Sequence, residues 1–295
     1  MAADVVALAV ARSRRHRLEA ERVAALADAY WARLDAADLA GSWEAVVGGP
    51  TVAAVTAGQL RAATDAAGYV GAATAAQGAA AAPAAVVPAR TFAGLAADGR
   101  DLRSLLYLPV IGTKWRIGQG MTVADALGYG RRQLRLIAVS ETQAAGRVAD
   151  GMALALEPRV TEYVRQVNLP SCGRCILLAG RVYRRNAGFK RHPRCDCIHV
   201  PVIGTGRPGT QDPGELFRGM SADEQDAAFG AGEAAAIRAG ADMGRVVNAT
   251  RGMKAPGELP PGRRRPGKPT PARLLDEYGD DPGALRDALH RFGYF

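Results

Sequence analysis

The chain has 295 residues, 48% of them hydrophobic, and a formal net charge of +9. This length suits one large domain or two ordinary ones. Alanine, the best helix former, supplies much of the apolar fraction, so the composition predicts a mainly helical protein. The apolar run Val5–Ala11 is too short to cross a membrane and arginines follow it at once, which argues against a membrane partner and a secretory signal. We therefore expect a protein made in a reducing cytoplasm.

The first part of the chain reads as helix. An apolar face at three- and four-residue steps predicts one long helix over 5–39, and an Ala/Val/Leu face predicts another over 43–68, broken at Gly48-Gly49-Pro50. We expect His16 and its neighbouring arginines on the solvated face of the first helix. These elements make residues 1–70 an N-terminal helical region. The Ala-rich stretch 71–90 has high helix propensity but lacks large side chains, and it is expected to be a helical or extended connector that separates this region from the rest.

Residues 91–253 resume a globular pattern. The run of leucines from Leu102 is expected to end at Pro109, and Trp115–Gly120 is expected to be a loop with an anchoring tryptophan. Thr122-x-x-Asp125 predicts the start of a long helix that ends near Pro158. Ser221-x-x-Glu224 predicts a capping box at a later helix.

Three short stretches favour β-structure. Val160, Tyr163 and Val164 are typical of a strand within 159–167, and a hairpin is expected from 181–185 returning as 198–203. Residues 254–272 read as a Pro/Arg linker and 273–295 as a C-terminal helical segment. The predicted fold class is mainly α with a small α+β module: a helical N-terminal half, a small Cys-rich antiparallel β module at 159–205 and short C-terminal helices.

All four cysteines fall in that module, as Cys172-x2-Cys175 and Cys195-x-Cys197, with His192 between the pairs. Thiolates at such spacing suit a tetrahedral metal, and in a reducing compartment metal binding is favoured over disulfides. We therefore predict a structural zinc site. Its ligands are either the four cysteines or three cysteines with His192, and disulfides formed after release from the cell are the alternative to a metal.

The positive charge is concentrated in the same region. Residues 159–210 hold ten Lys or Arg and two acids, a net charge of +8. Such a face suggests a polyanion, with nucleic acid first; a merely solvated surface or an acidic protein partner is the alternative. The candidate nucleic-acid-binding residues are Arg181, Arg184, Arg185, Lys190, Arg191 and Arg194.

No catalytic constellation is readable, so we predict that the chain is not an enzyme. His16 and His290 are surrounded by charged residues without a nucleophile motif, and the His-x-Glu of zinc deaminases is missing. A metal-structured nuclease would have only Asp196 and His199 as a catalytic pair.

The cysteine region also resembles a known family. Cys172-x2-Cys175, then Gly180-Arg181-Val182-Tyr183, then His192-Pro193-Arg194-Cys195-Asp196-Cys197 is similar to the phage head-morphogenesis family, the MuF-like minor capsid proteins, of the actinobacterial phage type. A weaker resemblance extends to 140–142 and 246–253. The resemblance implies a structural minor capsid protein in the virion head, associated with the portal protein and the capsid and in possible contact with packaged double-stranded DNA. The runner-up is a zinc-ribbon-like nucleic-acid-binding protein unrelated to capsids, ahead of a capsid-maturation protease or a nuclease.

Overall fold

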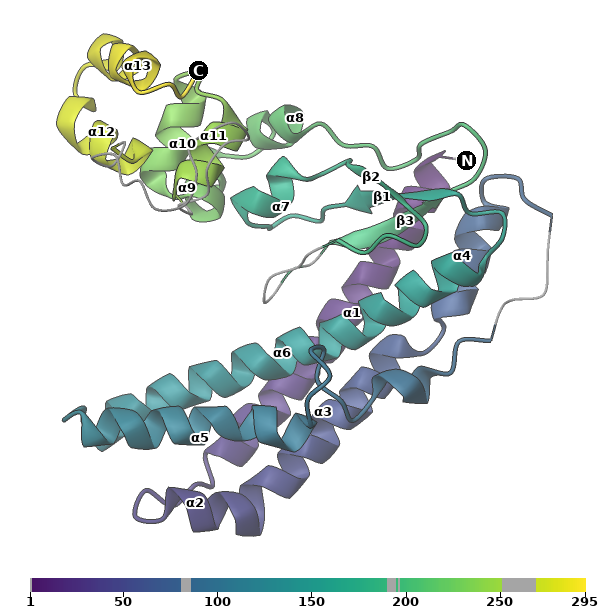
Figure 1. The fold of residues 1–295 in the computed structure, drawn as a ribbon, viewed down its shortest axis with the longest axis vertical. Helices are drawn as coiled ribbons and strands as arrows, with labels where there is room; N and C mark the ends of the chain where they lie inside the picture. The colour runs from purple at the N-terminus through teal and green to yellow at the C-terminus, as the bar shows by residue number, and fades with distance from the viewer. Residues whose placement is uncertain (1, 81–85, 190–194, 196, 251–268) are drawn as a thin grey trace, which may run out of the picture. The chain divides into compact units, whose positions relative to one another are not determined.

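The computed structural model describes residues 2–80, 86–189, 195, 197–250 and 269–295. As predicted, the fold is mainly helical with a small three-stranded antiparallel sheet and short C-terminal helices (Figure 1). The chain forms two compact units. One comprises residues 1–166 and 182–209, and the other comprises 167–181 and 210–295.

The first unit is built around a long helix, α6 (Val123–Leu156), which contacts most of the other helices of this unit. Its N-cap Thr122 accepts a hydrogen bond from the backbone N–H of Asp125, as the sequence predicts. The elements around it are α1 (Ala2–Trp31), α2 (Leu39–Ser42), the π-helix η1 (Trp43–Val47), α3 (Gly48–Ala63), α4 (Ala66–Ala75), the 3-10 helix η2 (Ala89–Phe92) and α5 (Leu102–Gly118).

Two predicted helix boundaries are wrong. The first helix ends at Trp31 rather than at residue 39, and Gly48-Gly49-Pro50 starts α3 instead of breaking a helix. Proline is tolerated there because the first turn of a helix makes no use of its missing N–H. Gly48 is required by packing, since a Cβ atom at this position would lie 2.6 Å from Nε1 of the buried Trp43.

The Ala-rich stretch begins as a helix, one of its two predicted forms, but it also contributes to the core, which was not predicted. Its first residues belong to α4, where Tyr69, Val70 and Ala73 are buried in a core shared with α1, α6 and the sheet. Small side chains do not prevent burial here, because they let helices approach closely. Residues 81–85 of the predicted connector lie outside the described residues.

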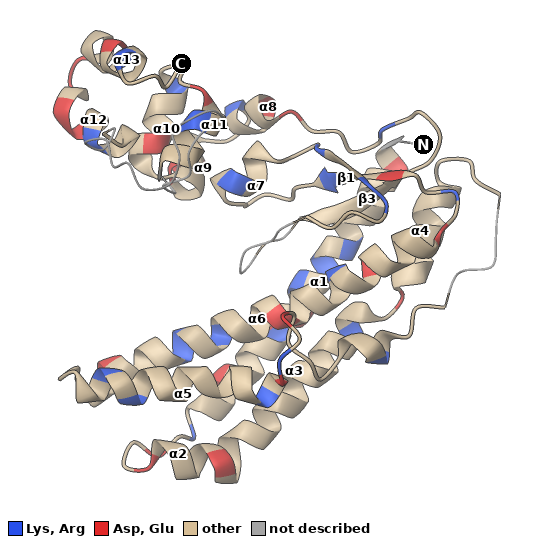
Figure 2. Cartoon of the chain, in the orientation of Figure 1, with Lys and Arg blue, Asp and Glu red and all other residues tan. Residues whose placement is uncertain are grey.

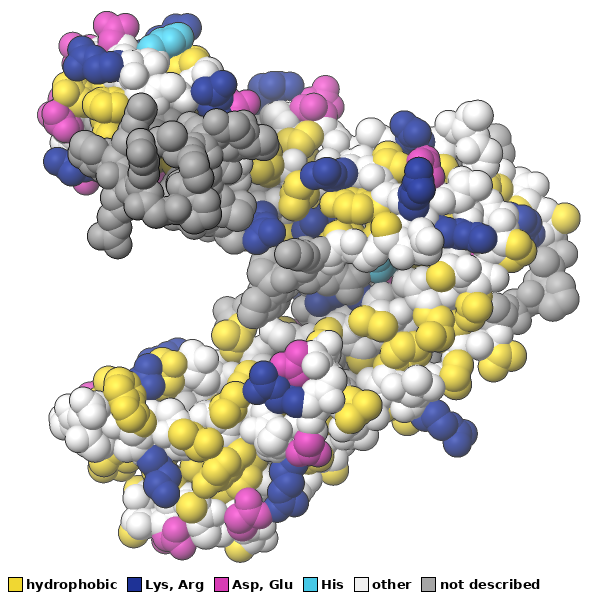
Figure 3. All heavy atoms as spheres, viewed as in Figure 1, with side chains coloured by type: hydrophobic (Ala, Val, Ile, Leu, Met, Phe, Trp, Pro, Cys, Tyr) yellow, Lys and Arg dark blue, Asp and Glu magenta, His cyan; other side chains and the backbone are white. Residues whose placement is uncertain are grey.

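The predictions for α5 need correction as well. The helix continues through Pro109 to Gly118, so Pro109 lies inside it and Trp115 is a helical residue rather than part of a loop. Trp115 does not anchor this segment, because 60% of its surface is exposed. Hydrophobic side chains reach the surface in the region of α5 (Figure 3), among them Leu108 and Ile111.

The sheet has the strand order β2-β1-β3, with β1 (Glu162–Gln166) in the centre, β2 (Val182–Arg184) and β3 (Ile198–Val202). The three strands lie where the sequence predicts them, but the expected direct hairpin between the second and third does not form. Both pair antiparallel with β1, with Val164 opposite Val182 on one side and Val200 on the other. The central place of β1 fits its apolar residues, which are buried.

The sheet is not separated from the N-terminal helices. β3 contacts α1, α4 and α6, and Val164, Ile198 and Val200 share one core with residues of these helices. The hydroxyl of Tyr69 donates a hydrogen bond to the backbone carbonyl of His199. The expectation that a connector decouples the helices from the sheet is therefore wrong.

His16, expected on a solvated helix face, is buried together with Arg12 on the inner side of α1. Both lie against α6, where a Cβ atom at Gly146 would come 2.6 Å from Nε2 of His16. Arg12 and His16 thus make buried polar contacts between helices, whereas Arg14 and Arg15 are exposed, as expected.

The second unit contains α7 (Gly173–Leu177), α8 (Pro213–Arg218), α9 (Ala222–Phe229), α10 (Ala231–Arg238), α11 (Met243–Thr250), α12 (Pro271–Tyr278) and α13 (Pro282–Arg291). Ser221 and Glu224 form the predicted capping box of α9. The chain end is docked, because Tyr294 is buried and its hydroxyl donates to the carbonyl of Pro269. Burial, together with the charge of Glu233, raises the pKa of Tyr294 to about 12.

In the part of the chain that the structure describes, no helix combines the length and apolar character that a membrane span requires.

Candidate metal centre

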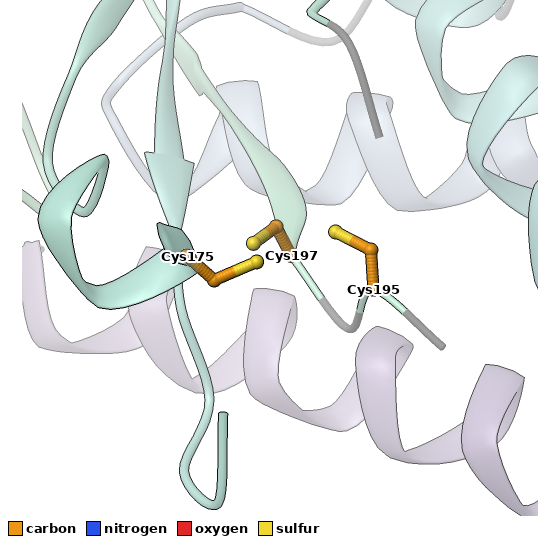
Figure 4. Close-up of side chains that lie close together, drawn as sticks. All are labelled: Cys175, Cys195 and Cys197. Carbon is orange, nitrogen blue, oxygen red and sulfur yellow. The ribbon is translucent and has the colours of Figure 1, made fainter. Parts of the chain in front are cut away.

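Three of the four cysteines form a buried cluster. One ligand atom from each of Cys175, Cys195 and Cys197 lies within 4.8 Å of the others. Cys175 belongs to the short helix α7, whereas Cys195 and Cys197 directly precede β3. Figure 4 shows the three sulfur atoms pointing toward a common space. Among the described residues, this is the group of His, Cys, Asp or Glu side chains that could hold a metal ion.

The donor set fits a soft, tetrahedral ion. Zinc binds thiolate sulfur at about 2.3 Å, so tetrahedral geometry places two ligating sulfurs roughly 3.8 Å apart. Sulfur atoms within 4.8 Å of one another reach that spacing with small adjustments. None of the four cysteines, all of which the structure describes, forms a disulfide.

The fourth ligand stays open. Cys172 is half-buried at the N-cap of α7 and does not belong to the group of three. His192 lies outside the described residues, as do Asp196, Lys190, Arg191 and Arg194. Both predicted ligand sets, four cysteines or three cysteines with His192, therefore remain open.

Two buried arginines contact Cys195. The Nη2 atom of Arg165, in β1, lies 4.0 Å from the sulfur of Cys195, and Arg165 is only 1% exposed. Arg147, in α6, donates a hydrogen bond from Nη1 to the backbone carbonyl of Cys195. Positive charge thus lies beside a candidate thiolate ligand.

A cluster of aromatic side chains on the sheet lies beside Arg165. Tyr163 stacks on Tyr183, its partner across the β1–β2 pair, with ring centroids 5.4 Å apart. The imidazole of His199 lies edge-on to Tyr163 at 4.6 Å and near Phe189 at 5.3 Å. The guanidinium of Arg165 lies over the ring of Phe189 at 4.3 Å. His199 is therefore a packed side chain of the sheet in this structure.

Several basic residues of this region serve the fold. Arg185 donates from Nη1 to the carbonyls of Glu157 and Val160, at 3.1 and 3.4 Å. Arg159 pairs with Glu157, and Arg207 pairs with Glu162. Of the six candidate nucleic-acid-binding residues, Arg181 and Arg184 are the described ones that are exposed. Figure 2 marks the positions of the basic residues along the described chain.

Sequence reasoning missed the roles of Arg147 and Arg165. The available signal was weak. Arg165 interrupts the β-branched and aromatic stretch 160–167, and Arg147 follows Gln143 by one helical turn, with Nη1 of the arginine 3.5 Å from Oε1 of the glutamine. A charged residue within a stretch of buried residues needs a specific polar contact. Arg165 and Arg147 both contact Cys195.

Comparison of the chain with protein-family models, with curated proteins and with solved structures finds no match.

Proposed function

We propose that this chain is a structural, non-enzymatic minor component of a tailed-phage head, in which a zinc ion bound by the cysteine cluster holds the small sheet together. The observation that carries the structural role is the burial of Cys175, Cys195 and Cys197 around one space. Catalytic zinc sites keep a coordination position open to water or substrate, whereas structural sites are closed by protein ligands. Buried thiols fit the closed kind.

Zinc analysis of protein purified under reducing conditions tests the metal. We expect about one zinc per chain, because thiolates of this geometry bind zinc tightly when the protein is folded. Protein without metal, with all four thiols reacting freely with a thiol reagent, would overturn the zinc site.

The phage-head role rests on the sequence resemblance described above, which spans the two cysteine pairs and the Gly180–Tyr183 segment between them. The proposed partners are the portal protein and the capsid, and the proposed location is the virion. The test is mass spectrometry of density-purified phage particles that carry this gene. Recovery with the particles in a few copies is expected, and recovery only among the free proteins of the lysate would contradict the role.

Contact with double-stranded DNA is a further part of the proposal. Arg181 and Arg184 are exposed, and contacts between arginines and phosphates weaken as salt rises. Reversing both charges, as R181E/R184E, is expected to abolish retention on DNA at low salt. The matched control R14E/R22E changes the net charge equally on the exposed surface of α1. Equal loss of retention in both variants would show that net charge alone matters, and no loss in either would remove DNA from the proposal.

A zinc-ribbon-like nucleic-acid-binding protein outside any capsid is the second candidate, favoured by the same cysteines and arginines. It predicts DNA binding without recovery in particles. The enzyme alternatives have less support. His199, the one described member of the candidate nuclease pair, is buried between aromatic rings, an environment suited to packing.

A further inference from the structure

The two arginines that contact Cys195 come from different elements and touch different atoms of it. Arg165 lies on the central strand β1, directly opposite His199 of β3, and its Nη2 atom is 4.0 Å from the cysteine sulfur. This distance is within the range of an N–H···S contact. Arg147 lies on α6 and binds the backbone carbonyl of the same cysteine.

Both side chains are buried and held in place. The ring of Phe189 covers the guanidinium of Arg165 at 4.3 Å, which favours a cation on its face. Arg147 is buried on α6, with Oε1 of Gln143 3.5 Å from its Nη1. A buried guanidinium is costly unless it meets negative charge or well-placed acceptors. The contact of Arg165 makes the sulfur of Cys195 one such acceptor, and a stronger one when that sulfur carries the negative charge of a thiolate.

Metal binding would create that charge. Zinc bound by three or four thiolates carries net negative charge, and burying it costs free energy that nearby cations reduce. Groups around a metal centre also orient its ligands, and losing such a group weakens metal binding by about 10- to 100-fold.

We propose that Arg165 and Arg147 are positioning residues of the metal centre: Arg165 offsets the thiolate charge at the Cys195 sulfur, and Arg147 fixes the backbone that carries it. This inference rests on the zinc site proposed above. The ordinary reading of a buried arginine is an ion pair within the fold, as Arg12 makes with Asp150 at 2.8 Å. Arg165 and Arg147 are singled out because each also contacts a candidate ligand, Cys195.

The test measures zinc affinity of the full chain by competition with a chromophoric chelator. The variants are R165M, R165K and R147M. Two matched controls are R184M, an exposed arginine of the same sheet, and R12M, a buried arginine paired with a carboxylate. Circular dichroism and urea unfolding of the metal-free proteins report the stability of each variant, so that a general loss of stability is recognised.

We expect R165M to weaken zinc binding by about 10- to 100-fold and R165K to recover part of the loss, because lysine restores the charge without the planar fork. R147M should alter the absorption spectrum of bound Co²⁺, since the Cys195 backbone is no longer fixed. R184M and R12M should change affinity by less than about threefold.

The zinc site and the positioning role of the two arginines are refuted by different results. A wild-type protein that takes up no zinc refutes the metal site itself. A wild-type protein that binds zinc, with R165M and R147M matching R184M in affinity and in the Co²⁺ spectrum, overturns the positioning role. If R165M does not fold, the zinc affinities of R165K and F189L test the role of Arg165. R165K removes the planar guanidinium, and F189L removes the aromatic ring that packs on it. Wild-type zinc affinity in both variants would also overturn the positioning role.

Discussion

Arg12 of α1 donates two hydrogen bonds to one carboxylate oxygen of Asp150 in α6. Its Nε atom lies 3.0 Å and its Nη2 atom 2.8 Å from Oδ1. The same guanidinium donates to the carbonyls of Ala62 and Thr64, at 3.0 and 2.8 Å, where α3 ends. Helix C-termini leave carbonyls without partners inside the helix, so a cation that binds them is favourable. One buried side chain therefore joins three helices that are far apart in the sequence.

Removing one side of this ion pair should be costly. We expect R12M to lower the free energy of unfolding by about 3–5 kcal/mol, because it leaves the carboxylate of Asp150 buried without its cation. The double variant R12M/D150L should be destabilised less than the sum of the single variants, since no charge is left uncompensated. Urea unfolding of the four proteins measures this coupling. Additive effects of the two substitutions would mean that Arg12 and Asp150 contribute independently.

The stability should also depend on the protonation of His16. Burial lowers the pKa of His16 well below its usual range, and the guanidiniums of Arg12, Arg147 and Arg15 lower it further, although Asp150 lies 3.8 Å from its Nε2 atom. The folded protein thus keeps this imidazole neutral, while the unfolded chain protonates it below about pH 6.5. Stability from this residue is complete above that pH and is lost as the pH falls, by up to about 1.4 kcal/mol per pH unit.

The measurement is urea unfolding between pH 7 and pH 5. We expect H16Q to show a flatter dependence than the wild type over this range, and H290Q, which removes an exposed histidine on α13, serves as the matched variant. A wild-type profile that is parallel to that of H16Q would rule out His16 as the source.

The three tryptophans should respond differently to substitution and to quenching. Trp43 is fully buried and Trp31 nearly so, whereas Trp115 is exposed. W43A is expected to cost about 3–5 kcal/mol because it empties a core position, and W115A should stay within about 0.5 kcal/mol. In W115F the fraction of fluorescence that acrylamide quenches should fall sharply. Unchanged quenching would contradict the exposed position of Trp115 on α5.

The four cysteines should not be equivalent. Since Cys172 lies outside the group formed by Cys175, Cys195 and Cys197, we expect C172S to weaken zinc binding less than the other three Cys→Ser variants. Limited proteolysis of the metal-loaded proteins gives a second readout. Cleavage near residues 170–200 should increase in C175S, C195S and C197S. Equal effects in all four variants would indicate that Cys172 is a full ligand.

Much of the fold could be predicted from local patterns, because caps and strand composition act over a few residues. Thr122 and Ser221 start helices where predicted, and the three strands lie at the predicted places. The errors arose where tertiary contacts decide. Pro109 and Trp115 look like a helix end and a loop, yet α5 continues through both because it packs along α6. Likewise, the charged neighbours of His16 suggest an exposed side chain, but its ring is buried against α6, where Gly146 has no side chain to exclude it.

The cysteine ligands of the candidate metal site could be predicted from the sequence, but the buried arginines beside them could not. Two cysteine pairs at short spacing indicate a metal site without any structure, and the structure brings three of the four together. The net charge of the region includes arginines with contacts inside the fold, because counting arginines in a sequence cannot separate exposed ones from those that bind backbone or acids. Arg185 binds carbonyls and Arg165 is buried beside Cys195, so neither belongs to an open basic surface.

The strand order β2-β1-β3 and the packing of β3 on α1 and α4 have a consequence for folding on the ribosome. Tyr69 meets its acceptor His199 130 residues later in the chain, and Arg12 meets Asp150 after 138 residues. The apolar sides of α1 and α4 stay uncovered until these later segments leave the exit tunnel. Contacts between residues so far apart in the sequence form slowly, and hydrophobic surface stays exposed until they form. We therefore expect nascent chains that end before β3 to depend on chaperones, and the finished chain to be released from them.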